Sequence, residues 1–123
     1  MSRQMGTAGA REPLSNEEDF VLSFSDIEVN IDRGVVTRRG RPIDLTPAEY
    51  DLLTCFLLNA DRDLSRDAIL ESVWSYLPSP NTRTVDAHVL RLRRKLEPDP
   101  NAPRHFITLH KVGYRFCTKN ASS

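Results

Sequence analysis

Hydrophobic and polar residues alternate through the first third of the chain. Ile27, Val29 and Ile31 are separated by polar residues, which is the period of two expected of a half-buried strand. Turn-forming residues bound four such runs, so we predict short strands at 20–24, 27–31, 35–38 and 43–45. Strands this close in sequence predict an antiparallel meander with an acidic outer face.

After residue 45 the apolar period becomes that of amphipathic helices. Thr46-Pro47-Ala48-Glu49 is a predicted capping box with proline at the first helical position, and it begins a helix to about residue 59. A turn follows at 61–63, and Ser65 is the predicted N-cap of a second helix over 66–74. The predicted inward positions of the two helices are Leu52, Leu53, Phe56, Leu57, Ile69, Leu70, Val73 and Trp74. Both are therefore expected to be core helices.

A third helix, predicted over 83–97, has a narrow apolar face and a cationic opposite face. At about 100° per residue its apolar positions fall within an arc of roughly 60°; they are Val85, Val89, Leu92 and Leu96. The far side carries Arg83, Ala87, Arg91 and Arg94. Prolines end this helix and confine the preceding segment, 75–82, to a loop. A hairpin over 105–118, turning at 110–113, completes the predicted elements.

This order of elements predicts an α+β winged helix-turn-helix: an N-terminal four-stranded antiparallel sheet, a three-helix core and a C-terminal β-hairpin wing. The 123 residues are enough for one small domain, which we place at 20–118. Residues 1–19 have almost no large apolar residue and are predicted to be a flexible tail or interdomain linker. Residues 119–123 are a predicted C-terminal tail.

The formal net charge of zero conceals a strong asymmetry between the two halves of the chain. Residues 1–63 hold 7 Lys and Arg against 12 Asp and Glu, whereas residues 64–123 hold 10 against 5. A polyanion is therefore expected to bind the C-terminal half. A helix fits the DNA major groove, about 12 Å wide, and a hairpin beside it reaches the backbone or minor groove.

Three residues of the third helix have side chains suited to base edges. Arg91 can bond guanine O6 and N7 with both arms of its guanidinium, the Thr84 methyl can pack on thymine, and Asp86 can accept from cytosine N4. The alternative for Asp86 is a first-turn carboxylate stabilised by the helix dipole. Flanking positions are better placed for phosphates, which orient a helix without specifying sequence; these are Arg83, His88, Arg94 and Lys95.

Other residues near these have two open interpretations each. Arg93 either contacts the DNA backbone or pairs with Glu97 one helical turn away. Trp74 is interpreted first as a core residue, although its indole N–H, like the side chain of Arg66, could bind phosphate. For Arg66, phosphate and solvent are equal alternatives. A cationic helix face is by itself often only solvated, so the wing and the charge segregation carry the prediction.

Several other functions are disfavoured. Cys55 and Cys117 are expected to be reduced thiols, and His88, His105 and His110 match no metal-ligand spacing, so neither metal nor cofactor is predicted. No signal peptide or membrane span is visible, which makes the cytoplasm the expected compartment. Enzymatic activity is the weakest alternative, because capping and surface exposure explain the acidic cluster Asp44, Glu49 and Asp51.

Four segments in a fixed order resemble the OmpR/PhoB-type effector domain of two-component response regulators. The match covers about residues 21–116, nearly the whole predicted domain. The matching segments are Leu45-Thr-Pro-Ala-Glu-Tyr50, Ser65-Arg66 with Val73-Trp74, Arg83-Thr-Val-Asp-Ala-His88 continuing into Arg91-Leu-Arg-Arg-Lys-Leu96, and Gly113-Tyr-Arg-Phe116.

The resemblance implies a bacterial transcription factor of a phosphorelay that binds tandem direct repeats of double-stranded DNA. By resemblance, Thr84, Asp86 and Arg91 contact bases, and Arg66, Trp74, Arg83, His88, Arg93 and Arg94 contact the backbone. The wing contributes His110, Lys111 and Arg115. RNA polymerase is the implied partner of the loop formed by Ser75, Tyr76, Leu77, Pro78, Ser79, Pro80, Asn81 and Thr82.

Two departures from the family pattern change what is expected of this chain. Leu90 stands where relatives usually have a basic residue, so one contact is either lost or replaced by packing on a thymine methyl. His110-Lys111 stands where the wing commonly has Arg-Gly, so the turn is expected to differ and the minor-groove arginine is absent.

The phosphoacceptor receiver domain of such regulators does not fit into the 19 residues that precede the predicted sheet. We therefore expect an excised effector domain, with a stand-alone regulator as the alternative, and a monomer or weak dimer in isolation. A different class of function also stays open: a protein-interaction module whose basic helix and proline-rich loop engage an acidic partner. DNA binding predicts a steep loss of affinity with salt, whereas the protein-interaction function predicts no preference among DNA sequences.

Overall fold

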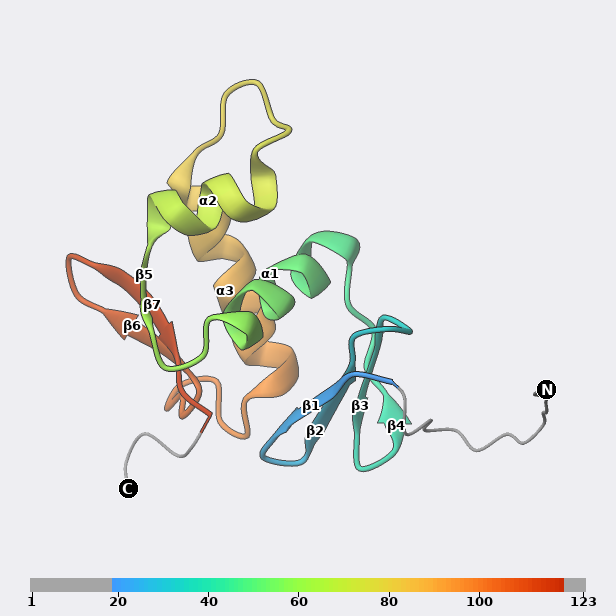
Figure 1. Cartoon of the computed structure of the whole chain (residues 1–123). Coiled ribbons are helices and arrows are strands. Elements are labelled where there is room, and N and C mark those ends of the chain that lie inside the picture. Colours follow the sequence, from blue (N-terminus) through green and yellow to red (C-terminus); the bar gives the residue numbers. More distant parts are fainter. Residues whose placement is uncertain (1–18, 119–123) are drawn as a thin grey trace.

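The computed structural model describes residues 19–118, and two antiparallel sheets lie on either side of three helices (Figure 1). The predicted linker 1–19, apart from Asp19, and the predicted tail 119–123 lie outside the described residues. The first sheet has the strand order β1-β2-β3-β4. Its strands are β1 Val21–Phe24, β2 Ile27–Asn30, β3 Val35–Arg38 and β4 Arg41–Pro42.

The predicted meander is confirmed, but its fourth strand lies earlier than expected. β4 is Arg41–Pro42 instead of 43–45, because Arg39 and Gly40, at φ 51° and 83°, form a tight turn that pairs the chain at once with β3. Ile43 prolongs this contact through a 2.8 Å bond from its N–H to the carbonyl of Val36. The apolar run 43–45 thus packs against the core instead of forming its own strand.

The outer face of this sheet is less acidic than predicted. Ile27 and Val29 are fully buried on the inner face, and Glu28 is exposed between them. The register places exposed Val21 and Val35 on either side of Asn30, so the face is mixed. Asp26 and Asp32 lie in the turns that join these strands, where the chain reverses, and not within the strands.

The helices begin where their capping residues predict. In α1, Pro47–Leu58, Thr46 Oγ1 accepts from the Glu49 N–H at 3.2 Å and Glu49 Oε1 accepts from the Thr46 N–H at 3.0 Å. In α2, Arg66–Trp74, Ser65 Oγ accepts from the Ala68 N–H at 3.0 Å. Both predicted core stripes are confirmed, although Val73 is only partly buried.

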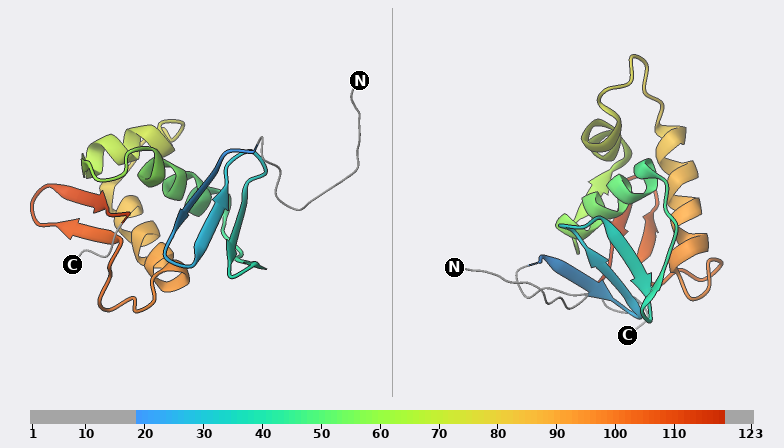
Figure 2. Two further views of the ribbon diagram at one scale, coloured as in Figure 1. Left: turned by 60° about the horizontal axis from the view of Figure 1, so that its bottom comes forward. Right: turned by 90° about the vertical axis from the view of Figure 1, so that its right-hand side faces the viewer.

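α3, Thr82–Leu96, is packed against α1 and α2 through its predicted narrow face. Val85, Val89, Leu92 and Leu96 have no exposed surface. The helix starts one residue before the predicted position because Asn81 is its N-cap and accepts from the Arg83 N–H at 2.8 Å. Figure 2 shows α3 at the margin of the molecule, with its opposite side turned away from α1 and α2.

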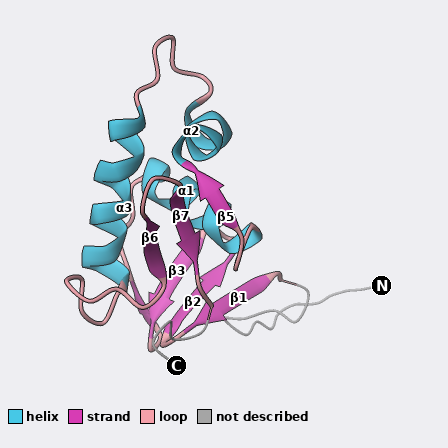
Figure 3. Ribbon diagram, turned by 90° about the vertical axis from the view of Figure 1, so that its left-hand side faces the viewer, coloured by secondary structure: helices cyan, strands magenta, loops and turns pink. Residues whose placement is uncertain are grey.

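The second sheet contains a strand that was not predicted. β5, Asp63–Ser65, pairs with β7, Gly113–Phe116, which also pairs with β6, Phe106–Leu109, so the predicted hairpin is the larger part of a three-stranded sheet. Figure 3 shows this sheet beside α3. A three-residue strand whose partner is about 50 positions away leaves no periodic signal, because its pairing depends on long-range contacts.

Candidate nucleic-acid interface

The side of α3 that faces away from the core is basic. Arg83, Arg91 and Arg94 are exposed along it. Leu90, one of the departures from the family pattern, is 45% exposed and adds an apolar surface to the same helix. The last turn also holds Arg93 and Lys95, at the helix end where cations are favoured by the macrodipole. This face can bind a polyanion and contact apolar groups.

Arg91 is held by a neighbouring ring. His88 Nδ1 lies 2.8 Å from the Thr84 carbonyl oxygen, which can only accept, so Nδ1 donates and Nε2 is left as an acceptor. Arg91 Nη1 lies 3.5 Å from that Nε2. The ring of His88 packs on Trp74 at 4.9 Å between centroids. Trp74 is 3% exposed, which supports its interpretation as a core residue.

Asp86 is engaged by two side chains from other elements. Its Oδ1 accepts from Arg66 Nε at 3.0 Å and from the Tyr114 hydroxyl at 2.7 Å. Burial, followed by the bond to Asp86, raises the pKa of Tyr114 to about 12. The structure therefore brings together Arg66 of α2 and Asp86 of α3, two predicted site residues, with Tyr114 of β7, which sequence analysis missed.

Of the two alternatives for Arg93, the structure does not show the pair with Glu97 in the part of the chain that it describes. Its guanidinium donates to the carbonyl oxygen of Phe106 at 2.9 and 2.6 Å, and to Thr108 Oγ1 at 2.7 Å. Desolvation lowers the pKa of Arg93, yet the group keeps its cationic bonds to β6. Arg93 thus fastens α3 to the outer edge of the wing sheet.

Glu97 is a buried carboxylate whose role was not predicted beyond the end of the helix. It is 4% exposed and accepts three backbone N–H groups, from Arg104 at 3.0 Å, His105 at 2.9 Å and Phe106 at 2.8 Å. These are the donors that precede and begin β6, so Glu97 ties the end of α3 to the start of the wing. The prolines that follow Glu97 were the only sequence signal of a fixed loop there.

Lys95, predicted to contact the DNA backbone, is directed toward α1. Its Nζ lies 2.6 Å from Glu49 Oε1 and 2.9 Å from the Asp44 carbonyl oxygen. Burial alone would raise the pKa of Glu49, but the bond and charge of Lys95 and the N–H of Thr46 hold it below its ordinary value. Two members of the acidic cluster noted in the sequence therefore bind Lys95, Glu49 through its carboxylate and Asp44 through its backbone carbonyl.

The tip of the wing is exposed, whereas its base is paired. His110 and Lys111 are exposed at the turn, where Lys111 takes a positive φ of 66°. Arg115 instead donates from Nε to Asp63 Oδ1 at 2.7 Å across β5 and β7, and this bond raises the pKa of its guanidinium. Of the three predicted wing residues, two lie at the tip.

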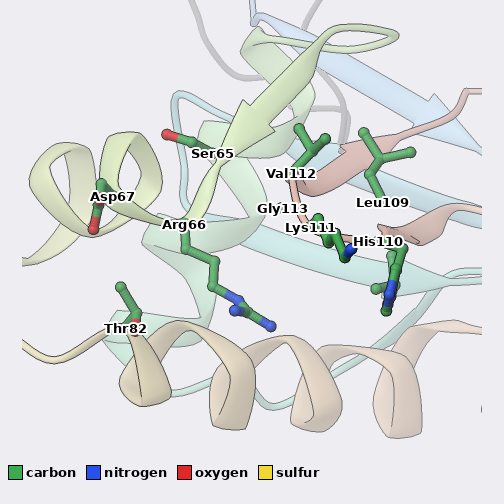
Figure 4. A pocket seen from close by; sticks show the side chains of 10 residues that line it. Ser65, Arg66, Asp67, Thr82, Leu109, His110, Lys111, Val112 and Gly113 are labelled. Atoms are coloured by element: carbon green, nitrogen blue, oxygen red, sulfur yellow. The ribbon is translucent and has the colours of Figure 1, made fainter.

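A cavity of about 400 Å³ separates this tip from the start of α2 (Figure 4). Figure 4 shows Arg66 extending from the first turn of α2 toward α3, opposite the wing residues. The lining residues are Ser65, Arg66, Asp67, Thr82, Thr108, Leu109, His110, Lys111, Val112 and Gly113. Arginine, lysine and hydroxyl groups on facing walls suit an anion of the size of a phosphate.

The predicted polymerase-contact loop connects α2 and α3 and projects from the body of the molecule (Figure 1). Tyr76 is 73% exposed, while Leu77 turns back and packs against the core. The Leu77 N–H donates to the Trp74 carbonyl oxygen at 3.0 Å, which continues the last turn of α2. Thr82 belongs to α3, so the loop itself is 75–81.

Cys55 and Cys117 are free thiols in the structure, and burial raises the pKa of both. Within residues 19–118, no group of three His, Cys, Asp or Glu side chains is placed to hold a metal ion. None of the helices in this range is long and apolar enough to cross a membrane.

Comparison with known proteins relates the chain to transcription regulators. A family model described as "Transcriptional regulatory protein, C terminal" matches residues 40–116. The response regulator MtrA of Mycolicibacterium smegmatis is 40% identical over 111 residues, which cover 88% of this chain and 49% of MtrA. MtrA of Mycobacterium tuberculosis is 42% identical over 100 residues, covering 81% and 44%. The chain thus spans about half the length of the curated relatives it matches.

Solved structures of similar proteins share the fold. The C-terminal effector domain of BfmR from Acinetobacter baumannii has a TM-score of 0.71 at 32% identity, covering 85% of this chain and 96% of that domain. DrrB of Thermotoga maritima, an OmpR/PhoB homologue, has a TM-score of 0.72 at 32% identity, covering 79% and 44%. The RstA DNA-binding domain of Klebsiella pneumoniae, solved with the RstA box, has a TM-score of 0.67 at 25% identity, covering 80% and 97%.

Proposed function

The chain belongs to the family of transcriptional regulatory proteins defined by their C-terminal domain, and from this premise we propose that it binds duplex DNA sequence-specifically as the effector domain of a two-component response regulator. The family regulates transcription and is not a family of enzymes. The observation that carries the proposal is the exposed basic face of α3 beside an exposed, basic wing tip. Because the DNA of bacteria lies in the cytoplasm, we propose the cytoplasm as the compartment of this chain.

α3 is proposed to enter the major groove, with Arg91 and Thr84 as its base contacts. Arg91 is exposed near the middle of the helix, and the 3.5 Å contact of its Nη1 with the acceptor Nε2 of His88 limits where its guanidinium points. A fixed, planar guanidinium favours guanine, whose O6 and N7 accept both of its arms. Leu90 is exposed one residue away and offers a thymine methyl the apolar contact that replaces a cation at this position.

Phosphate contacts are proposed on both sides of this helix. Arg83 and Arg94 are exposed on α3, and Lys111 and His110 are exposed at the wing tip. Arg66 borders the cavity between them, so a phosphate seated there would meet α2 and the wing together. The indole N–H of Trp74 and the ring of His88 are secondary candidates, because both side chains are at least partly buried in the core.

Besides Arg66, which bonds to Asp86 through its Nε, three cations expected at the interface have protein partners. Arg93 bonds to β6, Lys95 to Glu49 and Arg115 to Asp63. A DNA phosphate would have to replace these bonds, so we assign the three residues a smaller share of the affinity than Arg83 and Arg94.

The finer features of the proposal concern partners. For a family member of this type, we propose that two copies bind tandem direct repeats of DNA and that the isolated chain is a monomer or a weak dimer. The loop 75–81 is proposed to contact RNA polymerase, since Tyr76 is exposed on a segment that projects away from α3. This exposed loop also supports the second candidate function, a protein-interaction module that uses the loop and α3 on an acidic partner.

Selection from a random-sequence duplex pool with the purified chain tests the proposal. The expected result is enrichment of one half-site, recovered as a direct repeat when the pool is long enough for two copies. Enrichment of no sequence, with binding of an acidic protein partner retained, would favour the protein-interaction module.

A further inference from the structure

We infer that Asp86 and Tyr114 form a lock that fixes the angle between the recognition helix and the wing, which makes Asp86 a positioning residue and not a base reader. Only the predicted effect of the lock on DNA affinity rests on the proposed function. The lock itself is a feature of the free protein, so it can be tested with and without DNA.

One carboxylate oxygen joins three elements. Asp86 Oδ1, on the first half of α3, accepts from Tyr114 of β7 and from Arg66 at the start of α2. Tyr114 is only 5% exposed, so its hydroxyl has this carboxylate, and not solvent, as its partner. A charge-assisted bond from a buried hydroxyl is strong and directional, which is what a lock between elements requires.

The lock sits on the central strand of the wing sheet. Tyr114 is opposite Leu64 of β5 on one side and Thr108 of β6 on the other. A shift of this residue therefore moves all three strands together, including the tip with Lys111. The bond from the Tyr114 side chain to Asp86 therefore influences the position of that tip.

A second tie prevents rotation about the first. Arg93 donates to Phe106 and Thr108 of β6, and its guanidinium lies 5.9 Å from the centroid of the Tyr114 ring. Asp86 and Arg93 are seven residues apart, about two helical turns, and so lie on the same side of α3. Two ties at separate heights along one helix fix an orientation, whereas one tie fixes only a distance.

A base contact by Asp86 would break the bonds that it makes in this arrangement. To reach a cytosine amino group, the Asp86 carboxylate would have to turn away from Tyr114 and leave a buried hydroxyl without an acceptor. It would also release Arg66, which neutralises a carboxylate that otherwise faces a polyanion. Both effects oppose binding, so the bonds observed are those expected in the complex as well.

The first variant to test is Tyr114→Phe, which removes the hydroxyl without changing charge or volume greatly. We expect its affinity for the selected duplex to fall about 3- to 10-fold, with the preference at every base pair unchanged. Tyr50→Phe is the matched control, since it removes a hydroxyl that donates to the Ile31 carbonyl oxygen at 3.3 Å, in the other sheet. The control is expected to bind as the wild type does.

Asp86→Asn separates positioning from base reading. An asparagine reader favours adenine where an aspartate reader favours cytosine, so a base contact predicts a switch of preference at one position. A positioning residue predicts none, and the double variant Asp86→Asn with Tyr114→Phe should bind no more weakly than the weaker single variant. A switch from cytosine to adenine, or fully additive losses, would overturn the inference.

Residual dipolar couplings of backbone amides test the lock in the absence of DNA. In Tyr114→Phe, we expect the couplings of residues 106–116 to fit only a wing that is rotated relative to α3. In Tyr50→Phe, we expect the couplings to fit the wild-type orientation. An unchanged wing in Tyr114→Phe contradicts the lock even if DNA binding is confirmed. A rotated wing in a chain that selects no duplex supports the lock and contradicts the proposed function.

Discussion

Lys95 Nζ lies 2.6 Å from Glu49 Oε1, and this ion pair joins the last turn of the recognition helix to the first turn of α1. The same Oε1 accepts the Thr46 N–H of the capping box. Glu49 is 2% exposed, so its charge is balanced almost entirely by protein groups. The Glu49 carboxylate therefore both caps the N-terminus of α1 and holds the C-terminal end of α3 against α1.

The Glu49 pair predicts a stability loss in acid. Because the folded-state pKa of Glu49 is depressed, its contribution is complete above the unfolded value of about 4.5 and is lost as the pH falls through the folded value. Glu49→Gln should lower the free energy of unfolding by about 1–2 kcal/mol at pH 7. Urea unfolding of both proteins between pH 3 and 7 should show the difference shrinking below pH 4.5; a difference that grows in acid would contradict this sign.

Glu97→Ala should destabilise the junction between α3 and the wing. It leaves the N–H groups of Arg104, His105 and Phe106 without their acceptor, a loss of roughly 1–3 kcal/mol for buried donors. Glu71→Ala, at an exposed position of α2, is the control and should change the free energy of unfolding by less than about 0.5 kcal/mol. Equal effects of the two variants in chemical denaturation would contradict the role given to Glu97.

Gly113→Ala should be more harmful than Gly40→Ala. A Cβ at Gly113, where φ is +153°, would lie 2.1 Å from the Leu64 carbonyl oxygen, whereas one at Gly40 meets nothing within 4 Å. We expect a loss of roughly 2–4 kcal/mol for Gly113→Ala, from strain and close contact together. Gly40→Ala has only its positive φ to strain it, at about 1 kcal/mol. Thermal unfolding of both variants measures the difference, and similar melting temperatures would contradict it.

Arg91→Ala and Arg94→Ala should differ in the kind of affinity they lose. Arg91→Ala is expected to cost about 1–3 kcal/mol and to relax the preference at one base pair. Arg94→Ala should weaken all duplexes alike and lower the salt slope by about one. Binding of a panel of single-substitution duplexes to each variant measures both effects. A uniform loss for both would show that the division into base and backbone contacts is wrong.

Elements whose signals are local were predictable from the sequence. The capping box at Thr46 and Glu49 formed as predicted because all of its partners lie within four residues. The apolar stripe of α3 predicted its buried face for the same reason, since one helix periodicity determines which residues share a side. The order of elements and the family resemblance then gave the winged-helix architecture.

Features that depend on distant residues were not predictable. β5 forms through its pairing with β7, in which Leu64 lies opposite Tyr114, and a three-residue segment has no hydrophobic periodicity of its own. The alternative that paired Arg93 with Glu97 was wrong because both residues have other partners: carbonyl and hydroxyl oxygens of β6 for the cation, and three N–H groups at and just before the start of β6 for the carboxylate. Charge on a helix face predicted where cations lie, but not which of them the protein itself engages.

The salt dependence of binding to the selected duplex, measured beside a scrambled duplex of the same length, tests the central claim most directly. Four phosphate contacts, made by Arg66, Arg83, Arg94 and Lys111 at about 0.9 each, predict that log K falls with log salt at a slope of about −3.6. The selected duplex should also bind at least about 1,000-fold more tightly than the scrambled one. A slope near zero, or equal affinity for both duplexes, would contradict sequence-specific DNA binding by this chain.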